Sequence, residues 1–535
     1  MAPATVGRQA PDGATYDAPV GAPALGRGRR GAAEPTGWAL PVLVAAVVVS
    51  ATFRVVALEA LTGELYGDIA IVHEYLAEIR DGRWPTAFHL SAGPLYHYLI
   101  APVVLVGGEG YTTLKVASVL VSAGVLAATY LLARELVDRQ TAAVTLFVAG
   151  ASSWLLVFSR LGNSQIVTPL ITTGALWFAV RTARRDDRWS AVDCGAAAAL
   201  GLYAYPQTFV VPPALLVVLV LLRKTGSGVR WGDVGRFAGT EALLAVPFLL
   251  IAAADRRTFL DGYIGGKIHS RSSTVDTLVH NAWRAAQAFH VRGDEVFRSN
   301  PVGSPHLDRV SGILFLAGLV WWLAPSRRRW WPVVLLPLVL FQLPAIFVLR
   351  NEDEVPSASR TLLVAPLVYV ITASGLCWLV TVVARRREVV GRAVLVALLC
   401  AVTMLNSERY FGAYADGLPD RNVPFGRVIA DFFERLPEDT HAFTLGCCWG
   451  QAGQPEPKGI TYLDAGPVAT GMVELQLDQV DCVALDALPR PAVLVWAPED
   501  VLPSPALAPC AAELRSELHT VDGQPVFRSL LLPEP

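Results

Sequence analysis

Long apolar runs alternate with short polar stretches over most of this chain, and their lengths predict its main elements. A helix needs roughly 17 to 25 mostly apolar residues to cross a bilayer. Twelve segments come near this length: residues 37–58, 93–108, 112–133, 141–158, 165–181, 190–205, 206–222, 236–254, 309–325, 330–349, 360–384 and 391–408. The pattern predicts a polytopic α-helical membrane protein.

Basic residues at the ends of these segments predict their orientation, because cytoplasmic loops of membrane proteins are rich in Lys and Arg. Such clusters stand at Arg134 and Arg139 and at residues 181–188, 223–230, 327–329 and 385–387. Twelve full spans cannot place all of them on one side. Eleven spans can, provided that 93–108, which is short and contains Pro94 and Pro102, is an interfacial or re-entrant piece. We therefore expect eleven spans.

This topology assigns the outer face of the membrane to a small set of regions. They are the loop 59–92 with an extension to 111, the turns 159–163 and 203–207, the loop 255–308 and everything after Asn406. Polar side chains concentrate in these regions, so we expect the chemistry outside the cytoplasm of a multi-pass plasma-membrane protein.

The two ends of the chain differ from the apolar middle. Residues 1–36 are rich in Gly, Ala and Pro and end in GRGRRG, which predicts a disordered tail held in the cytoplasm by its arginines. The transmembrane domain is expected over 37–410. From 411 to 535 the apolar runs shorten to strand length, as in HAFTLGCCW, GITYLDA, VDCVALDA and PAVLVWAP, which predicts a small extracytoplasmic α/β domain.

The composition of the chain restricts its possible binding partners. The chain is 53% hydrophobic and 17% charged with a formal net charge of −2, so it lacks the basic surface that a nucleic-acid partner requires. Few of its basic residues are lysine, and Ala, Gly and Pro abound, which is typical of GC-rich bacterial coding. Cys447, Cys448, Cys482 and Cys510 fall outside the membrane and permit disulfides in any of three connectivities.

The stretch ELYGDIAIVHEYL, at 64–76, begins where the first apolar run ends. A helix over 68–80 would place one apolar stripe on the membrane, formed by Ile69, Val72, Leu76 and Ile79. Asp68 stands at the start of this helix. Its carboxylate could serve only as a helix cap, or it could act as a general base at the lip of a membrane cavity.

A second amphipathic helix is expected in the other long outer loop, over TVDTLVHNAWRAAQAFH at 274–290. Its apolar positions are Leu278, Ala282, Trp283, Ala286 and Phe289. Charged residues flank it and could face an anionic headgroup, although we expect most to be solvated: Lys267, His269, Arg271, Arg292, Asp294 and Arg298.

Several blocks, taken in order, resemble a known class. SAGPLYHYL at 91–99 follows the acidic outer loop, and FSRLGNSQIVTPL, GAAAALGLYAYPQTFVVPP, FHVRGDEVFRSNPVGSPHLDRVSGILFLAGL and PSASRTLLVAPLVYVITASGL begin at 158, 195, 289 and 356. Over about 60–410 the chain resembles the GT-C class of polytopic glycosyltransferases. The resemblance is strongest to the family 39 group of protein mannosyltransferases and aminoarabinose transferases.

The resemblance implies transfer of a sugar, with inversion, from a polyprenyl-phosphate donor in the bilayer to a protein, lipid or glycan acceptor outside the cytoplasm. Asp68 matches the acidic residue that deprotonates the acceptor, although many members have an Asp-Glu pair where this chain has Asp68-Ile69. Arg160 and Arg360 would bind the donor phosphate or else anchor at the interface. Lys267 and Arg271 would assist them, and His97 would contact sugar or acceptor or else pack among tyrosines.

Two other functions stay open at this stage. A transporter or flippase of lipid-linked intermediates would show internal repeats and ionisable residues at mid-span. No repeat is evident, and the spans are nearly free of charge apart from residues at their ends and Glu241. A catalytically silent relative that binds lipid-linked glycans is compatible with the missing Glu beside Asp68. No cofactor is implied; a divalent metal is conceivable, but one carboxylate is a poor ligand set. An enzyme requires Asp68, Arg160 and Arg360 to converge on one outward cavity.

Overall fold

The computed structural model describes residues 38–63, 65, 67–84, 86, 93–108, 110–185, 187–256, 274–348, 354–446, 449, 457–463, 466–476, 480–513 and 515–534. The chain divides into two units, Met1–Trp38 and Ala39–Pro535, and every element below belongs to the second. The tail expected at 1–36 lies outside the described residues. The domain boundaries at 36 and 410 stay predictions.

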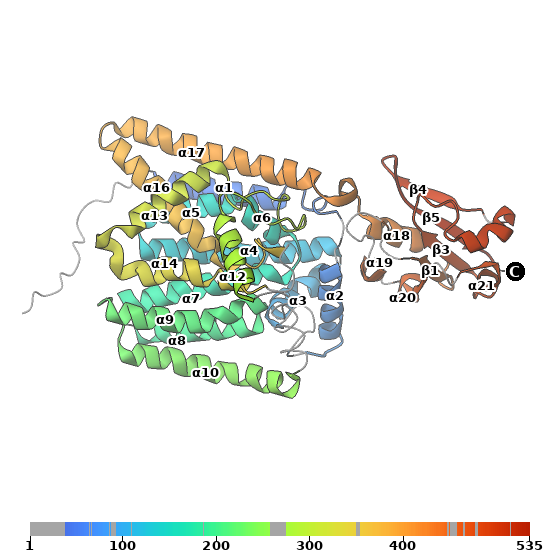
Figure 1. Cartoon of the computed structure of the whole chain (residues 1–535), viewed down its shortest axis with the longest axis horizontal. Coiled ribbons are helices and arrows are strands. Elements are labelled where there is room, and N and C mark those ends of the chain that lie inside the picture. The colour runs from blue at the N-terminus through green and yellow to red at the C-terminus, as the bar shows by residue number, and fades with distance from the viewer. Residues whose placement is uncertain are drawn as a thin grey trace, which may run out of the picture. The chain divides into compact units, whose positions relative to one another are not determined.

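Each of the twelve apolar segments forms helix, and Figure 1 shows these helices packed side by side. The helices are α1 (Ala39–Val55), α3 (Leu95–Gly107), α4 (Tyr111–Leu136), α5 (Arg139–Ala151), α6 (Ser153–Arg160), α7 (Val167–Arg184), α8 (Arg188–Leu200), α9 (Val211–Lys224), α10 (Trp231–Ala254), α13 (Arg309–Leu323), α14 (Trp331–Leu340), α15 (Leu343–Ile346), α16 (Ala365–Ala384) and α17 (Glu388–Glu408).

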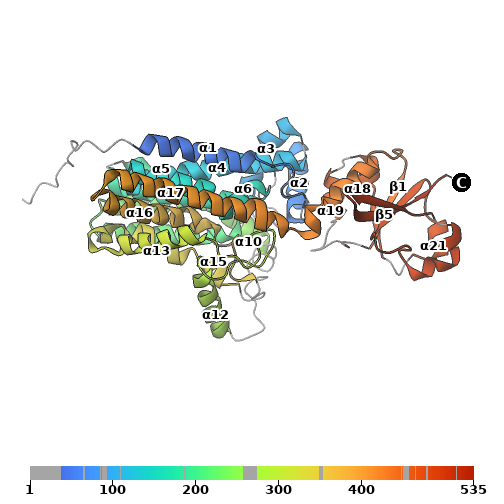
Figure 2. The same cartoon turned by 90° about the horizontal axis from the view of Figure 1, so that it is seen from above.

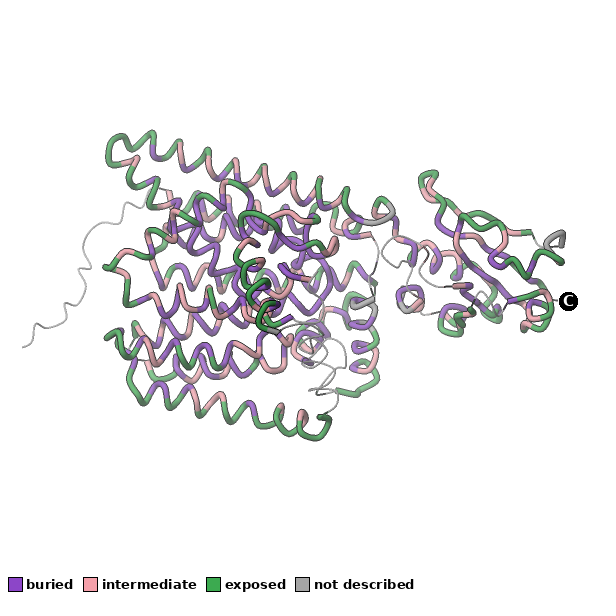
Figure 3. The backbone as a smooth tube through the Cα atoms, in the orientation of Figure 1, coloured by how far each residue is buried: buried purple, intermediate pink, exposed green. Residues whose placement is uncertain are grey.

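Length and composition allow seven helical segments in the described part of the chain to cross a membrane, and the bent pair α5–α6 makes an eighth. Eleven spans, as predicted, result if α1, α8 and α13 also cross and α3 does not. This count remains a prediction. Of the apolar stretch of α7, 67% is buried, against 11% of that of α10, which lies at the margin of the bundle (Figures 1 and 3). Helix α10 thus has the exposed apolar surface of a lipid-facing span.

Helices α13 and α16 meet so closely that their contact requires glycine. A Cβ atom on Gly318 would lie 1.9 Å from the carbonyl oxygen of Ile371, and one on Gly375 would lie 2.1 Å from that of Leu314. Small residues at such crossings let two helix backbones approach and gain van der Waals contact.

The segment 141–158, expected as one span, is bent by 61° between α5 and α6. The break lies at Ser152, whose Oγ accepts a hydrogen bond from the backbone N–H of Leu155, 3.2 Å away, and so caps α6. The same hydroxyl bonds to the Tyr369 hydroxyl of α16. A capping serine with a buried partner therefore interrupts the span without proline.

Both expected amphipathic helices are present, as α2 (Gly67–Arg80) and α12 (Thr274–Gln287). Figure 2 shows α12 standing away from the bundle. Its exposed face carries Trp283, 64% accessible, with Val275 and Val279. Such a row suits a membrane surface, and the location of α12 on the membrane stays a prediction. Phe289, however, lies beyond the end of α12 and is buried, with its ring 6.1 Å from that of Trp154.

The C-terminal part contains a five-stranded sheet of order β2-β1-β3-β5-β4. Strand β1 pairs in parallel with β2 and β3, and β5 pairs antiparallel with β3 and β4. The strands are β1 (His441–Leu445), β2 (Val473–Leu475), β3 (Ala492–Trp496), β4 (Glu517–Val521) and β5 (Gln524–Leu532). Short helices accompany the sheet: α18 (Phe425–Phe433), α19 (Pro457–Leu463), α20 (Pro467–Thr470) and α21 (Cys482–Asp486).

The structure corrects two strand expectations in this part. GITYLDA and VDCVALDA form the helices α19 and α21 rather than strands. Asp481 explains the second, since its carboxylate accepts the backbone N–H of Ala484 at 2.7 Å and caps α21. Cys482 forms a disulfide with Cys510, which selects among the open connectivities, while Cys447 and Cys448 lie outside the described residues.

Candidate active site

Asp68 is the second residue of α2, at the helix start that the apolar stripe predicted. The buried residues of that stripe are Ile69, Val72, Leu76 and Ile79. They pack α2 against its neighbours, among them α3 and α19, so the stripe does not face the membrane as expected but lies inside the protein. The first turn of a helix has free backbone N–H groups that favour an ionised carboxylate. The backbone therefore places Asp68 where a carboxylate is stabilised; its side chain lies outside the described residues.

Arg160 ends α6 and is buried, with 1% of its surface accessible. Its Nη1 donates a hydrogen bond to the carbonyl oxygen of Phe53, 2.6 Å away, at the end of α1. Its guanidinium carbon lies 5.0 Å from the ring centroid of Tyr410 and 5.6 Å from that of Phe411. Within the described part of the chain, Nε and Nη2 have no hydrogen-bond partner. Arg160 therefore retains buried donors in a fork that suits an anion.

A second buried arginine lies near Arg160. Arg54 of α1 donates from Nε to the Ser122 hydroxyl at 2.9 Å and from Nη1 to the carbonyl oxygen of Gly150 at 2.9 Å. Neither Arg54 nor Arg160 forms an ion pair with any carboxylate that the structure describes. Buried cations are ordinarily paired, because losing their hydration is costly. Carbonyl and aromatic groups stand in for a counter-ion here.

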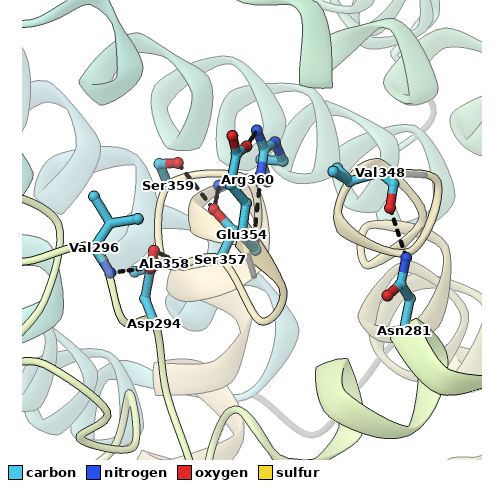
Figure 4. Close-up of polar contacts among 9 residues, drawn as sticks. All are labelled: Asn281, Asp294, Val296, Val348, Glu354, Ser357, Ala358, Ser359 and Arg360. Atoms are coloured by element: carbon cyan, nitrogen blue, oxygen red, sulfur yellow. Dashed lines mark hydrogen bonds and ion pairs between the residues drawn. The ribbon is translucent and has the colours of Figure 1, made fainter. Parts of the chain in front are cut away.

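Arg360 lies in the segment that leads into α16, and there it forms an ion pair with Glu354 (Figure 4). Its Nη1 also donates to the backbone carbonyl of Glu354 at 3.3 Å. The two side chains are 18% and 28% accessible. Arg360 is therefore neither a solvated anchor nor an unoccupied phosphate fork. The Glu354 carboxylate occupies the position on the Arg360 guanidinium where an anionic ligand would bind.

Asp294 fixes the backbone beside Arg360, although we expected the charged residues of its loop to be mostly solvated. Its carboxylate is 1% accessible and accepts the backbone N–H groups of Val296 at 2.8 Å and Ala358 at 2.7 Å (Figure 4). Burial raises the pKa of Asp294 to about 6. The two hydrogen bonds and Arg360 lower this pKa by smaller amounts, and Glu354 raises it slightly further. Asp294 thus ties the loop between α12 and α13 to the segment that carries Arg360.

Side chains from the bundle hold the same segment from the other side. Trp154 of α6 donates from Nε1 to the carbonyl oxygen of Ala358 at 2.9 Å, and Gln207 donates to that of Ser359 at 2.8 Å. Trp154 and Arg160 are six residues apart in α6, or about 9 Å along its axis at 1.5 Å per residue. The segment of Arg360 thus contacts α6, the short helix that ends at Arg160. The convergence of Arg160, Arg360 and Asp68 on one cavity stays a prediction.

His97 is fully buried on α3. Its ring meets those of Tyr75 and Tyr96 edge to face, with centroids 5.2 and 5.7 Å away. Tyr96 in turn hydrogen-bonds to the Ser118 hydroxyl at 2.8 Å. This surrounding matches the packing alternative given for His97, and a role as a sugar or acceptor ligand stays a prediction.

The remaining predicted donor contacts, Lys267 and Arg271, lie outside the described residues. Among the described residues, no group of three or more His, Cys, Asp or Glu side chains could hold a metal ion. Of the two arginines, Arg160 offers to an anion buried donors left unpaired by the residues that the structure describes, whereas Arg360 is paired with Glu354.

A cavity of about 870 Å³ lies elsewhere, between α13, the C-terminal end of α17 and the loop before α13. Arg309 and Arg409 line its polar part together with Asp308 and Glu408. Neither α2 nor the segment of Arg360 contributes to its lining, so it is separate from the residues considered above.

Comparison with known proteins agrees with these features. Residues 91–251 match the family model described as dolichyl-phosphate-mannose-protein mannosyltransferase. No curated protein sequence matches the chain. The matched part covers the helices from α3 to α10 and includes Arg160.

Solved structures show the same fold over nearly the whole chain. ArnT from Cupriavidus metallidurans bound to undecaprenyl phosphate is 16% identical, covers 93% of this chain and 98% of its own, and superposes with a TM-score of 0.59. The archaeal oligosaccharyltransferase AglB from Archaeoglobus fulgidus, in complex with an inhibitory peptide and a dolichol-phosphate, is 12% identical over 92% of this chain and 74% of its own, with a TM-score of 0.50. The resemblance found in the sequence is thereby confirmed: the chain has the fold of a GT-C membrane glycosyltransferase.

Proposed function

We propose that this protein transfers a sugar from a polyprenyl-phosphate donor in the plasma membrane to an acceptor on the outer face, with inversion at the anomeric carbon. The observation that carries the proposal is the fold shared with ArnT over 93% of the chain, in a structure that holds undecaprenyl phosphate. The family model matched at 91–251, which describes a dolichyl-phosphate-mannose-dependent enzyme, supports the same donor chemistry.

In the proposed reaction an acceptor hydroxyl attacks the anomeric carbon while the bond from that carbon to the phosphate oxygen breaks. The hydroxyl proton passes to the Asp68 carboxylate, which acts as general base, and polyprenyl phosphate leaves with the bonding electrons. The free N–H groups in the first turn of α2 would favour the ionised form of the Asp68 carboxylate, which is the form that accepts a proton.

The leaving phosphate gains negative charge, so cations near it lower the barrier. Arg160 fits this role best among the described residues, because its buried Nε and Nη2 lack partners. Arg360 would have to exchange Glu354 for the phosphate. Lys267 and Arg271 would add to the donor site, and His97 would contribute through the packing of α3.

The decisive experiment offers purified protein radiolabelled polyprenyl-phosphate sugars with a cell-envelope acceptor. Wild type is compared with Asp68→Asn, and Asp81→Asn, an exposed acid just beyond α2, serves as the matched control. We expect wild type and Asp81→Asn to transfer sugar and Asp68→Asn to lose about 100-fold or more, as removal of a general base does. Folding of each variant is checked by its unfolding temperature.

Other outcomes assign other functions. Full activity of Asp68→Asn would exclude that residue as the base. Lipid binding without transfer or hydrolysis by wild type would favour the silent relative. Movement of the lipid between leaflets of a vesicle, without transfer, would favour a transporter.

A further inference from the structure

The short loop between α1 and α2 is held by two side chains from distant parts of the chain. Lys115, on α4, donates from Nζ to the carbonyl oxygens of Leu58, Glu59 and Thr62 at 3.1, 2.9 and 2.6 Å. Asn422, just before α18, donates to the carbonyl oxygen of Ala60 at 2.6 Å and accepts the N–H of Gly63 at 2.6 Å. Five backbone groups within six residues are thus fixed by side chains remote in sequence.

Lys115 is fully committed to this loop. An ammonium group has three N–H donors, and the three carbonyl oxygens use all of them. The side chain is 1% accessible, and Nζ lies 4.3 Å from the ring centroid of Tyr111. The charge is therefore balanced by carbonyl dipoles and an aromatic face, and its removal would leave three acceptors unpaired.

Asn422 approaches the loop so closely that a side chain at position 63 is excluded. A Cβ atom on Gly63 would lie 2.3 Å from the carbonyl oxygen of Asn422. Asn422 itself has a φ of 63°, a left-handed conformation that asparagine tolerates better than most residues. The sequence thus supplies the two residue types that this contact needs.

The same loop connects with the surroundings of Arg160. The Tyr111 hydroxyl lies 2.9 Å from the Thr62 hydroxyl and donates to the carbonyl oxygen of Leu161 at 3.2 Å. Leu161 directly follows Arg160. One hydrogen-bonded network therefore joins the loop that leads to α2 with the turn that carries the proposed phosphate ligand.

We propose that Lys115 and Asn422 are positioning residues for catalysis: they fix the loop 58–63 and so set where α2 begins and where Asp68 stands. This inference rests on the proposed function, in which Asp68 is the base. Gly63 precedes Asp68 by only five residues, so a mobile loop would also make the position of the first turn of α2 variable. Catalysis by a positioned base tolerates little such freedom, since misplacement by about 1 Å can cost roughly 100-fold in rate. Asn422 makes the region entering the C-terminal sheet a part of this arrangement.

The test compares Lys115→Met and Asn422→Ala with wild type in two separate measurements. Amide hydrogen exchange of the peptide covering 58–72 reports the loop and does not depend on activity. Turnover at saturating donor, together with donor affinity, reports catalysis. Asn422→Asp keeps the acceptor for the N–H of Gly63 but loses the donor to the carbonyl of Ala60, so its exchange rate and turnover should lie between those of wild type and Asn422→Ala. Asn281→Ala is the matched control, because Asn281 likewise donates to two backbone carbonyls, those of Ile346 and Val348, away from the loop.

We expect faster exchange at 58–72 in both variants, turnover lower by about 10- to 100-fold and donor affinity within about twofold of wild type. Asn281→Ala should leave the exchange of that peptide unchanged. In an Asp68→Asn background, Lys115→Met should reduce turnover by less than about twofold further, because both changes act on one step. If Lys115 had a purely structural role, Lys115→Met would reduce turnover by the same factor in the wild-type and the Asp68→Asn backgrounds.

Three outcomes would overturn the inference. Unchanged exchange would mean that these side chains do not hold the loop. Faster exchange with wild-type turnover would mean that the loop does not position the base. Wild-type turnover in Asp68→Asn would refute the proposed base, and with it the positioning role, while the exchange measurement would still decide whether Lys115 and Asn422 hold the loop.

Discussion

Replacing Asp294 by asparagine tests whether a buried carboxylate holds the segment of Arg360. In wild type the two carboxylate oxygens accept the N–H groups of Val296 and Ala358. An asparagine has one acceptor oxygen, so one of these buried N–H groups loses its partner. The expected constant penalty is about 1 to 3 kcal/mol in the free energy of unfolding.

A second contribution depends on pH. Burial raises the pKa of Asp294 from the ordinary value of 3.8 to about 6, so the folded state binds more protons than the unfolded state between these values. The contribution of Asp294 to stability is therefore full below the lower value and declines as pH rises through the window. From about pH 4.5 to about pH 7.5 the decline amounts to about 2 kcal/mol. Asparagine does not titrate, so the difference between wild type and Asp294→Asn should narrow by this amount.

The comparison with the variant is essential, because another buried group titrates in the opposite direction. Burial lowers the pKa of His306 to about 3, so its contribution to stability rises with pH over much of the same range. Equilibrium unfolding of both proteins in mixed micelles at several pH values isolates Asp294. Parallel curves, with a difference that does not change with pH, would refute a buried carboxylate of raised pKa at this position.

Three further predictions concern other contacts. Gly375→Ala should lower stability by at least about 2 kcal/mol, because its Cβ would meet the backbone of Leu314 and Gly318, whereas Gly174→Ala, with open space around it, should not; their unfolding temperatures decide. Cys482→Ser with Cys510→Ser should cost about 3 kcal/mol, because the disulfide closes a separation of 28 residues; equal stability of wild type with and without reductant would contradict this. Glu354→Gln should tighten binding of a polyprenyl phosphate about fivefold if Arg360 binds phosphate, since a partly buried ion pair no longer competes; unchanged affinity would remove Arg360 from the donor site.

Periodic features were predictable from the sequence. Each of the twelve long apolar runs became helix, and the stripe of Ile69, Val72, Leu76 and Ile79 lies on one face of α2, although it packs inside the protein and not on the membrane as expected. Such patterns are local, because a helix repeats every 3.6 residues whatever it packs against. The bend at Ser152 had a local signal too, a serine able to cap a helix within an apolar run, and the Asp522-Gly523 turn between β4 and β5 is a hairpin signal.

The residues that organise the candidate site could not be found in this way. Lys115, Asn422 and Asp294 act on backbone groups about 50, 360 and 60 positions away, as their hydrogen bonds show, and no pattern within a window of the sequence records such a partner. A lysine near the start of an apolar span was the one available hint for Lys115, since charge is costly there. Asp294 was expected to be solvated like the charged residues beside it, an expectation that holds for its neighbours Arg292 and Glu295, which are exposed and pair with each other.

These contacts also bear on the choice between an enzyme and a transporter. Lys115 and Asn422 fix the loop that leads to Asp68, and Asp294 and Trp154 fix the segment that carries Arg360. All of them bond to backbone, and breaking each buried bond without a new partner costs about 1 to 3 kcal/mol. A transport cycle that moved these segments relative to the spans would have to break several of these hydrogen bonds at the same time. A site that stabilises developing charge gains from the same rigidity, because its dipoles need no reorganisation during the reaction. These contacts therefore favour catalysis at a fixed site over transport.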